Sequence, residues 1–519
     1  MDGFLSTNHK PLNIALGIVG IIIAAKIFDI IYAIFLHPLR KIPGPWYTKA
    51  SRLPYGRRLL DGSSVVWLQE LHRKYGPVVR YTPNEISVIN GDIAWQEIYG
   101  FRTGKQKGVG SFLKDRVWYA PPMDGVPSLI MTNDADHSRQ RRILSHAFSE
   151  KSMRNQEPLI QRYADLLISR LKETDVAAGK PADLTQWYNW TTFDIIADLT
   201  FGAPFGCLAQ ATTHKYVNLL LSSIKAFSLF YLFHHFPALQ QLRKYVVKSD
   251  VIKLRQEWMD FVKSSTHKRI EAETERHDFM TDILAKQRDE EEKGHEGITT
   301  QEITSNANLL LVAGTETTAT TLTGTTYLML KHPEVYQKLK DEVRGRFKSQ
   351  DEISIEAAGE LSYTLAVLNE SMRYMPPVPA GFVRKVPQEG AEVSGYWLPG
   401  NCDASISVSQ YPAYHSDANF RDSELYAPER WLGDLKYKDD NRATFSPFSF
   451  GPRNCLGKNL AYAEMRVILA KMIFNFDFEL QEDSTDWFNR LDVRTLWTKP
   501  ALNVKLTAVH SEGRKKEKM

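Results

Sequence analysis

Hydrophobic residues recur at helical spacing over most of residues 140–375, a pattern that predicts a body built mainly from α-helices. The longest uninterrupted helical pattern runs from Thr299 to His332. Thr299 and Glu302 have the spacing of a capping box at its start, and Pro333 would stop the helix at its other end. Strand-like segments are short and lie at residues 77–90, 391–399 and 493–506. The chain therefore predicts a mainly α fold with a small β region.

The N-terminal region carries the strongest apolar run, from Leu12 to Leu36. A membrane span needs about twenty predominantly apolar residues, and this run is longer. Lys26 and Asp29 interrupt it, but they are three positions apart and can pair on one helix face. A cleaved signal peptide fits poorly, because the run is too long and no small-residue cleavage site follows. We expect residues 12–36 to be a transmembrane anchor, with a helix lying in the membrane interface as the alternative.

Positive charge follows the anchor, at Arg40, Lys41, Lys49, Arg52, Arg57 and Arg58. The positive-inside rule then places residues 1–11 in the lumen and the remainder of the chain in the cytosol. Residues 37–58 are expected to form a basic hinge, which Pro43-Gly44-Pro45 stiffens. Residues 59–510 would form one catalytic domain, and the charged residues 511–519 a disordered tail.

Overall composition excludes some classes of protein without selecting one. The net charge of +4 is too small to suggest a nucleic-acid-binding protein. The three cysteines, Cys207, Cys402 and Cys455, are far apart in the chain and cannot form a disulfide framework. The folded part is therefore expected in a reducing compartment.

One cysteine has surroundings that suit a metal ligand, in the stretch Phe448-Ser-Phe-Gly451-Pro-Arg453-Asn-Cys455-Leu-Gly457. A thiolate is a strong axial ligand for haem iron. Gly451 and Gly457 would let the backbone turn sharply and approach a flat macrocycle, and Arg453 can hold a haem carboxylate. A helical pattern begins just after Gly457, so a helix N-terminus would favour the thiolate. The alternative is an ordinary buried cysteine.

This stretch resembles the haem-binding loop of the cytochrome P-450 monooxygenases, and further motifs in the expected order extend the resemblance over residues 40–510. The resemblance implies the cytochrome P-450 fold, haem b as cofactor and Cys455 as the ligand of its iron, with Phe448 in the same loop. It also implies a reaction that inserts one oxygen atom from dioxygen into an apolar molecule.

A second motif, Ala313-Gly314-Thr315-Glu316-Thr317-Thr318, lies in the middle of the longest helical pattern. Its flanks are apolar, so a glutamate there needs a reason. Thr317 can bond to a carbonyl one turn back or to a water molecule. Taken alone, the motif is also compatible with a kink whose glutamate reaches solvent. It resembles the oxygen-activating turn of the family, which implies that Glu316 and Thr317 pass protons to dioxygen and that Gly314 leaves space for it.

Two charged groups complete the candidate site. Glu370 and Arg373 are three apart on a helical pattern with apolar flanks, and a buried pair would need a further partner such as Arg430. The resemblance implies that these three lock the core behind the ligand loop. His137 and Arg141 are four apart and alone indicate a basic helix surface. The resemblance places this pair, together with Arg384, against the haem propionates.

Aromatic residues gather in segments 108–131 and 226–245, which in the family roof the substrate pocket, while residues 379–383 and the turn at Leu496-Trp497 would add walls. These segments predict an apolar, medium-sized substrate. The residues around Cys455 most resemble fungal members that tailor secondary metabolites, including hydroxylases of sesquiterpene toxins. A terpenoid or a polyketide is therefore the expected substrate class.

Electrons are expected to come from a separate protein, because no nucleotide-binding glycine motif of the G-x-G-x-x-G kind appears. The resemblance implies NADPH–cytochrome P-450 reductase, with cytochrome b5 as a second donor, at the endoplasmic reticulum membrane. Candidate docking residues are Arg139, Arg142, Arg346, Lys348 and Lys458. Two alternatives remain open: a reductase-independent haem-thiolate isomerase or dehydratase, which often lacks the acid–threonine pair, and a non-catalytic membrane haem-binding protein.

Overall fold

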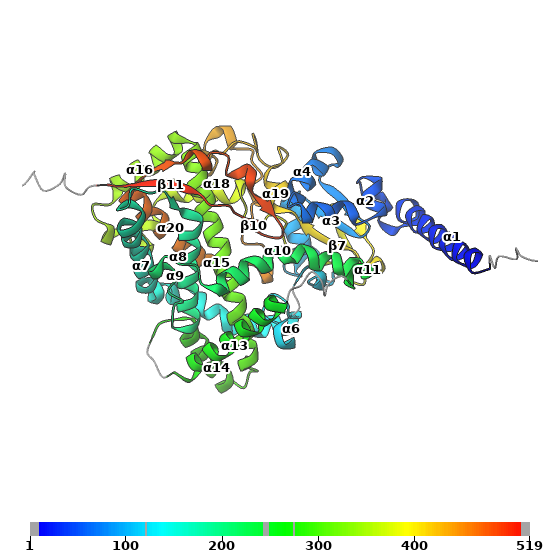
Figure 1. The fold of residues 1–519 in the computed structure, drawn as a ribbon, viewed down its shortest axis with the longest axis horizontal. Helices are drawn as coiled ribbons and strands as arrows, with labels where there is room; N and C mark the ends of the chain where they lie inside the picture. Colours follow the sequence, from blue (N-terminus) through cyan, green and yellow to red (C-terminus); the bar gives the residue numbers. More distant parts are fainter. Residues whose placement is uncertain (1–9, 120–121, 242–248, 273–275, 510–519) are drawn as a thin grey trace, which may run out of the picture.

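The computed structural model describes residues 10–119, 122–241, 249–272 and 276–509. Helices dominate it, as the sequence predicts (Figure 1). The helices are α1 Lys10–Ile31, α2 Trp46–Ala50, α3 Leu53–Leu60, α4 Ser64–Tyr75, α5 Gly91–Ala94, α6 Asp134–Leu144, α7 Glu150–Leu171, α8 Leu184–Phe201, α9 Cys207–Gln210, α10 Lys215–His235, α11 Pro237–Gln240, α13 Ser249–Glu271, α14 Phe279–Glu292, α15 Thr300–Lys331, α16 Pro333–Arg346, α17 Ile355–Gly359, α18 Ser362–Tyr374, α19 Gln410–Tyr414 and α20 Lys458–Asn475.

The longest helix, α15, crosses the whole helical body and packs against α8, α13, α18 and α20 (Figure 1). Its capping box is present, because the Thr299 hydroxyl accepts from the Glu302 N–H and the Glu302 carboxylate accepts from the Thr299 N–H. The helix ends at Lys331, and Pro333 begins α16. Both predicted ends are therefore confirmed to within one residue.

The β region is larger than the sequence predicts. The strands are β1 Val78–Thr82, β2 Glu85–Val88, β3 Ala182–Asp183, β4 Arg384–Lys385, β5 Ala391–Val393, β6 Tyr396–Leu398, β7 Ser405–Val408, β8 Phe476–Leu480, β9 Asp492–Val493, β10 Trp497–Thr498 and β11 Asn503–Ala508. They form a sheet of order β1-β2-β7-β4, a sheet of order β3-β11-β8, and the two pairs β9–β10 and β5–β6. The expectation missed β3, β4, β7 and β8, because they are short or, like β8, follow a helix without a turn signal.

The apolar N-terminal run is helical, as α1 followed by a π-helical turn to Leu36, and it projects from the body beside the small sheet (Figure 1). The part from Ile14 to Leu36 is long and apolar enough to cross a membrane. Lys26 and Asp29 form the expected pair at 3.0 Å. Residues 1–9 of the expected lumenal segment and the whole of the expected tail lie outside the described residues.

The proline-rich hinge is fastened to the body rather than free. The Arg80 N–H of β1 donates to the Pro43 carbonyl at 2.7 Å, and the Arg80 guanidinium donates to the Ala33 carbonyl at 3.1 Å. A Cβ on Gly44 would lie 2.3 Å from the Arg80 carbonyl oxygen, so only glycine allows this approach. The anchor therefore leaves the body at an angle that β1 fixes.

Candidate functional site

The loop around Cys455 is a tight turn that leads into α20. The Cys455 N–H donates to the Phe448 carbonyl at 2.8 Å, which closes the turn. Gly451 has a φ of +73°, and a Cβ there would lie 1.9 Å from the Tyr99 carbonyl oxygen. The sharp turn at Gly451 is thus as expected, but the close approach that requires glycine is to Tyr99 and not to a macrocycle. At Gly457 the nearest atom to an added Cβ is Phe148 Cε1 at 3.9 Å, so no protein contact excludes a side chain there.

The thiol of Cys455 is accessible to solvent even though protein atoms crowd it. This crowding raises the pKa of the Cys455 thiol, and the Gly457 N–H together with the charges of Arg141 and Lys458 offsets only part of the rise. The N–H at the start of α20 thus lowers the pKa of the Cys455 thiol, as expected, but burial outweighs it.

Helix α6 holds the ligand loop from one side. The Arg141 guanidinium donates to the Asn454 carbonyl at 2.5 Å and to its side-chain oxygen at 2.6 Å. Arg453 donates to the Thr132 carbonyl at 2.9 Å and to Asp134 at 2.7 Å. Arg141 is therefore engaged with the loop that carries Cys455, and the expected contact of Arg141 with a haem propionate stays a prediction.

Several basic side chains lie beside this loop, and one of them, Lys114, was not identified from the sequence. Lys114 lies in the aromatic segment before α6, and its backbone forms an isolated antiparallel β-bridge with Arg384 of β4. Burial and the nearby charges of Arg384 and Arg453 hold the pKa of Lys114 well below its usual range. Burial, Arg453, Arg141 and Lys114 lower the pKa of His137 to about 3, so this imidazole is neutral at physiological pH. The cluster therefore has more basic side chains than carboxylates to pair with them among the described residues.

These cations leave hydrogen-bonding capacity for an anionic group. Within the described residues, neither Lys114 nor Arg384 forms an ion pair, whereas Arg453 pairs with Asp134. The buried Nη1 of Arg453 and Nε of Arg384 also have no hydrogen-bond partner in the described part of the chain. Buried guanidinium nitrogens are almost always bonded, so this arrangement fits the carboxylates of a cofactor.

The central turn of α15 has one open face. Ala313 is exposed although Leu311 and Thr315 beside it are buried. The Thr317 hydroxyl lies on this face and donates to the Ala313 carbonyl at 2.7 Å, one of the two bonds that its position allows. A Cβ on Gly314 would lie 2.8 Å from the side chain of Ile196. The close packing of α8 therefore accounts for Gly314 without reference to dioxygen.

Glu316 does not reach solvent, so a kink with a solvent-reaching glutamate is excluded. Its side chain is 5% exposed and forms an ion pair with Lys499, which follows β10. The carboxylate lies away from the open face of Thr317, because adjacent residues of a helix point in different directions. Lys499 is a second residue that sequence analysis missed, since a lone lysine after a strand gives no signal of burial.

A buried carboxyl ties α15 to the helix of the ligand loop. Glu464 of α20 bonds to the Thr318 hydroxyl of α15, and burial raises the pKa of Glu464 to about 8. The turn that carries Thr317 and the helix that begins after Cys455 are therefore linked directly. Nothing in the sequence distinguished Glu464 from a surface glutamate.

The predicted group of Glu370, Arg373 and Arg430 is assembled and fully buried. Arg373 donates to both Glu370 oxygens at 2.8–2.9 Å, and Arg430 Nε lies 3.1 Å from the same carboxylate. Asp440 completes the group by pairing with Arg430 at 2.6 Å. Burial opposes ionisation of Glu370, but the two guanidinium groups outweigh it and hold its pKa below the ordinary value.

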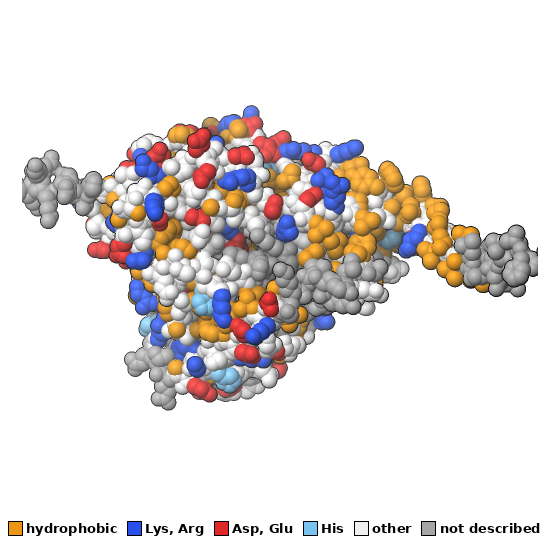
Figure 2. Space-filling model, in the orientation of Figure 1, with side chains coloured by type: hydrophobic (Ala, Val, Ile, Leu, Met, Phe, Trp, Pro, Cys, Tyr) orange, Lys and Arg blue, Asp and Glu red, His pale blue; other side chains and the backbone are white. Residues whose placement is uncertain are grey.

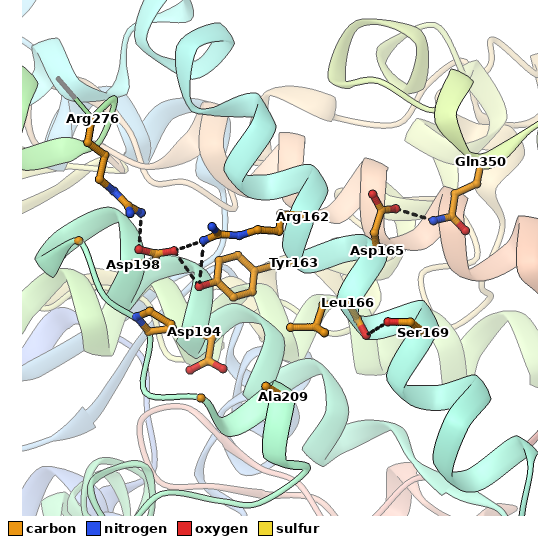
Figure 3. A pocket seen from close by; sticks show the side chains of 13 residues that line it. Arg162, Tyr163, Asp165, Leu166, Ser169, Asp194, Asp198, Ala209, Arg276 and Gln350 are labelled. Carbon is orange, nitrogen blue, oxygen red and sulfur yellow. Dashed lines mark hydrogen bonds and ion pairs between the residues drawn. The ribbon is translucent and has the colours of Figure 1, made fainter.

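A recess of about 830 Å³ lies elsewhere, between α7 and α8 (Figure 3). Asp198 in its wall accepts from the Tyr163 hydroxyl at 2.7 Å and pairs with Arg162 and Arg276. Because these charges satisfy one another across the recess, they act as a fastening between segments. We therefore do not take this recess as the functional site.

The aromatic roof segments are described only in part, because residues 120–121 and 242–248 lie outside the described residues. Phe112 is buried as a wall residue would be. Trp118 and Tyr231 instead donate to the Glu85 carboxylate of β2, at 3.2 and 2.8 Å. These two aromatic residues fasten the roof segments to the small sheet.

The exposed Cys455, the partnerless guanidinium nitrogens and the mainly α body fit a haem-thiolate protein. Comparison with known proteins gives the family. The family model described as Cytochrome P450 matches residues 44–506. The chain is 48% identical to the cytochrome P450 monooxygenase traB of Penicillium crustosum, over 98% of this chain and the whole relative. It is 40% identical to the cytochrome P450 monooxygenase aclL of Aspergillus oryzae, over 96% and 98% of the two chains. It is 38% identical to the averantin hydroxylase of Dothistroma septosporum, over 94% and 90%.

The chain therefore belongs to the cytochrome P450 family. It is a haem b-dependent monooxygenase of fungal secondary metabolism that uses dioxygen, a small-molecule substrate and redox partners. The relatives are named as monooxygenases or as a hydroxylase, and they do not favour an isomerase, a dehydratase or a non-catalytic haem-binding protein.

Proposed function

We propose that Cys455 is the axial ligand of the haem iron, and that Glu316 and Thr317 carry protons to dioxygen during hydroxylation or epoxidation. Bound haem supplies the iron at which dioxygen is activated, and a thiolate ligand favours cleavage of the O–O bond. The observation that carries the proposal is the exposed Cys455 near two buried guanidinium nitrogens, Arg453 Nη1 and Arg384 Nε, that have no hydrogen-bond partner in the described part of the chain. Thr317 contributes a hydroxyl on the open face of α15, and Glu316 a carboxyl one position away.

The haem carboxylates are assigned to the basic cluster of His137, Arg384, Arg453 and Lys114. The neutral imidazole of His137 can donate one hydrogen bond, and the partnerless Nη1 of Arg453 and Nε of Arg384 can donate others. Arg141 is assigned an indirect role: it holds Asn454, the residue before Cys455, by a hydrogen bond to its carbonyl. Phe448 packs 5.1 Å from the ring of Tyr462 and gives the loop an apolar side. Glu370, Arg373 and Arg430 have a structural role.

Residues 12–36 are assigned as a single span of the endoplasmic reticulum membrane, with residues 1–11 lumenal and the body, up to about residue 510, as one cytosolic catalytic domain. The basic residues after the anchor support this orientation. Apolar side chains continue from α1 onto the adjacent face of the body (Figure 2). Trp46 of α2 is 67% exposed, and Leu53 and Leu60 of α3 are 60% and 40% exposed, which supports contact of these helices with lipid.

NADPH–cytochrome P450 reductase is the proposed electron donor, with cytochrome b5 as a second. A surface recess of about 800 Å³ is lined by Phe450, by Lys458 at the start of α20 and by Arg142, which pairs with Glu290 at 2.7 Å, and we assign it as the docking site. Arg139 is a weaker candidate, because it is held by Glu302 at 2.6 Å. Arg346 is paired with Glu360 at 2.9 Å, whereas Lys348 and Lys458 are exposed.

The substrate is proposed to be an apolar secondary metabolite such as a terpenoid or a polyketide. The buried Phe112 and Trp497 support an apolar wall. The relative named for hydroxylating averantin supports hydroxylation as the reaction.

The test is the spectrum of the ferrous–CO complex. Wild-type protein should show the red-shifted Soret band of thiolate ligation, and Cys455→His should lose it. Cys207→Ser is the matched control, because Cys207 is a buried cysteine on α9 and should leave the band intact. Retention of the thiolate band in Cys455→His would remove Cys455 from the iron.

A further inference from the structure

Lys499 is a buried lysine at the centre of the molecule. Its side chain is 2% exposed, its ammonium pairs with Glu316, and Nζ lies 2.7 Å from the Thr320 hydroxyl oxygen. Lysine is almost never fully buried unless it is paired. Glu316 is therefore the reason that the fold tolerates Lys499, and the pair joins the segment after β10 to the centre of α15.

The backbone on both sides of Lys499 is fixed. The Trp497 indole N–H donates to the Pro376 carbonyl at 2.7 Å. The Pro500 carbonyl accepts from the Thr185 hydroxyl at 2.9 Å and from the Trp487 indole at 3.0 Å. A lysine held in this way cannot swing its head group into solvent without breaking these contacts. The fold thus delivers one positive charge to Glu316.

The two oxygens of Glu316 have different surroundings. Oε1 receives the Lys499 ammonium and lies 3.5 Å from the Thr320 hydroxyl. Oε2 is buried and has no hydrogen-bond partner among the residues that the structure describes. An unbonded buried acceptor costs free energy and calls for an explanation such as catalytic use or an ordered water. Glu316 can therefore take up a proton or a water molecule at one defined oxygen.

We propose that Lys499 is a positioning residue for the monooxygenase reaction. Its ammonium fixes the Glu316 carboxylate through Oε1 and leaves Oε2 as the open acceptor. Glu316 accepts a proton from water at Oε2, releases it toward the turn of Thr317 and returns to the carboxylate, and no electron moves through the pair. The inference rests on the proposed role of Glu316 as a proton carrier.

A purely structural ion pair makes a different prediction. Removing one partner of a buried pair leaves an uncompensated charge and destabilises the protein. If Lys499 only fastened β10 to α15, its loss would lower stability or haem content, while the molecules that keep haem would form as much product per NADPH as before.

The first experiment measures product, hydrogen peroxide and NADPH together, on holoprotein that retains the thiolate CO band. Lys499→Gln removes the charge and keeps an N–H donor, Lys499→Arg keeps the charge, and Lys505→Gln is a control at a lysine that is 51% exposed. We expect Lys499→Gln to lower product per NADPH about tenfold or more, since general acid–base help is worth about 10²–10⁴-fold. Lys499→Arg should lose much less, and Lys505→Gln nothing. Unchanged product per NADPH in Lys499→Gln would overturn the inference.

The second experiment reads the protonation of Glu316 from the infrared carbonyl band of a neutral carboxylic acid at neutral pH. Wild type minus Glu316→Gln should show no such band, because the Lys499 ammonium is bonded to the carboxylate. Lys499→Gln minus Lys499→Gln/Glu316→Gln should show one, since a lone buried carboxylate takes up a proton. The Glu464 band is common to all and cancels. A neutral-acid band in the wild-type difference would overturn the inference even if Lys499→Gln failed to fold.

The Glu316→Gln variant separates the two proposals. If it leaves product per NADPH unchanged, Glu316 carries no protons, and the proposed function fails at that residue together with this inference. If Glu316→Gln diverts NADPH to peroxide while Lys499→Gln does not, the proposed function stands and only the role of Lys499 is lost.

Discussion

Two groups of buried charged side chains, one around Glu370 and one beside Cys455, differ in their balance of acidic and basic residues. Around Glu370, two carboxylates (with Asp440) meet two guanidinium groups, those of Arg373 and Arg430, and each is bonded. Beside Cys455 lie the basic side chains of Lys114, Arg384 and Arg453, of which only Arg453 pairs with a carboxylate within the described residues.

In the group around Glu370 every charge already has a partner of opposite charge, so this group needs no ligand and its role is to stabilise the fold. The other group has three basic side chains and one carboxylate, that of Asp134, whereas haem b carries two propionate carboxylates. Buried charge is tolerated when it is paired. Basic side chains without carboxylate partners among the described residues therefore indicate where an anionic ligand would bind.

The largest expected effect comes from removing the shared carboxylate of the group around Glu370. Glu370→Ala should lower the free energy of unfolding by about 3–5 kcal/mol, because two buried guanidinium groups lose their shared carboxylate. Urea unfolding of the holoprotein, with haem retention as a second measure, checks it.

Glu360→Ala is the control for this effect, since Glu360 pairs with Arg346 at the surface, where the side chains are 61% and 51% exposed. Such pairs are worth about 0–1 kcal/mol. Equal costs for Glu370→Ala and Glu360→Ala would show that the group around Glu370 is not a structural lock.

A smaller effect comes from Glu464, a buried carboxyl that bonds to a hydroxyl and not to a cation. Its pKa is raised to about 8 by burial, against an ordinary value of 4.5. The folded state therefore prefers the neutral acid. The stability it contributes is fully present below pH 4.5 and is lost as pH rises toward 8. Between pH 5 and 7 the loss should approach about 2–3 kcal/mol.

The measurement compares wild type with Glu464→Gln, which is neutral at every pH and can keep the bond to Thr318. The stability of Glu464→Gln relative to wild type should rise steadily from pH 5 to 7. The exposed Glu479→Gln should show no such trend. A flat difference for Glu464→Gln would mean that Glu464 is ionised in the folded protein.

The sequence predicts local features of this molecule better than its long-range pairs. The ends of α15 follow from Thr299, Glu302 and Pro333, which act within one helical turn. Glu370 and Arg373 share one helix face, so their pairing is also local. The pairing of Ile86 with Ile406 in the parallel strands β2 and β7 depends on the tertiary fold, and β7 itself was missed.

The candidate site shows the same limit. The sequence identifies Cys455 and Thr317 through motifs, but Lys499 meets Glu316 from 183 positions away and has no motif. Gly451 was correctly expected at a sharp turn, whereas the contact that requires it comes from Tyr99. A motif thus indicates where chemistry occurs, and the partners that tune it come from segments that the fold brings together.

The smallest expected effect concerns the group of Lys114, Arg384 and Arg453 beside Cys455. Lys114→Met removes one of the basic side chains that repel each other there, so the protein fold should not be weakened as it is by Glu370→Ala. Haem should nevertheless be held less tightly, because a charge-assisted hydrogen bond to a carboxylate is lost. About 1.5 kcal/mol, or roughly tenfold in haem affinity, is expected. The rate of haem transfer to a haem-scavenging protein measures this loss, and urea unfolding measures the fold. Lys107→Met, at an exposed lysine seven positions before Lys114, is the matched control and should change neither. If Lys114→Met released haem no faster than Lys107→Met, Lys114 would not face a propionate, and the excess of basic side chains would need another anion.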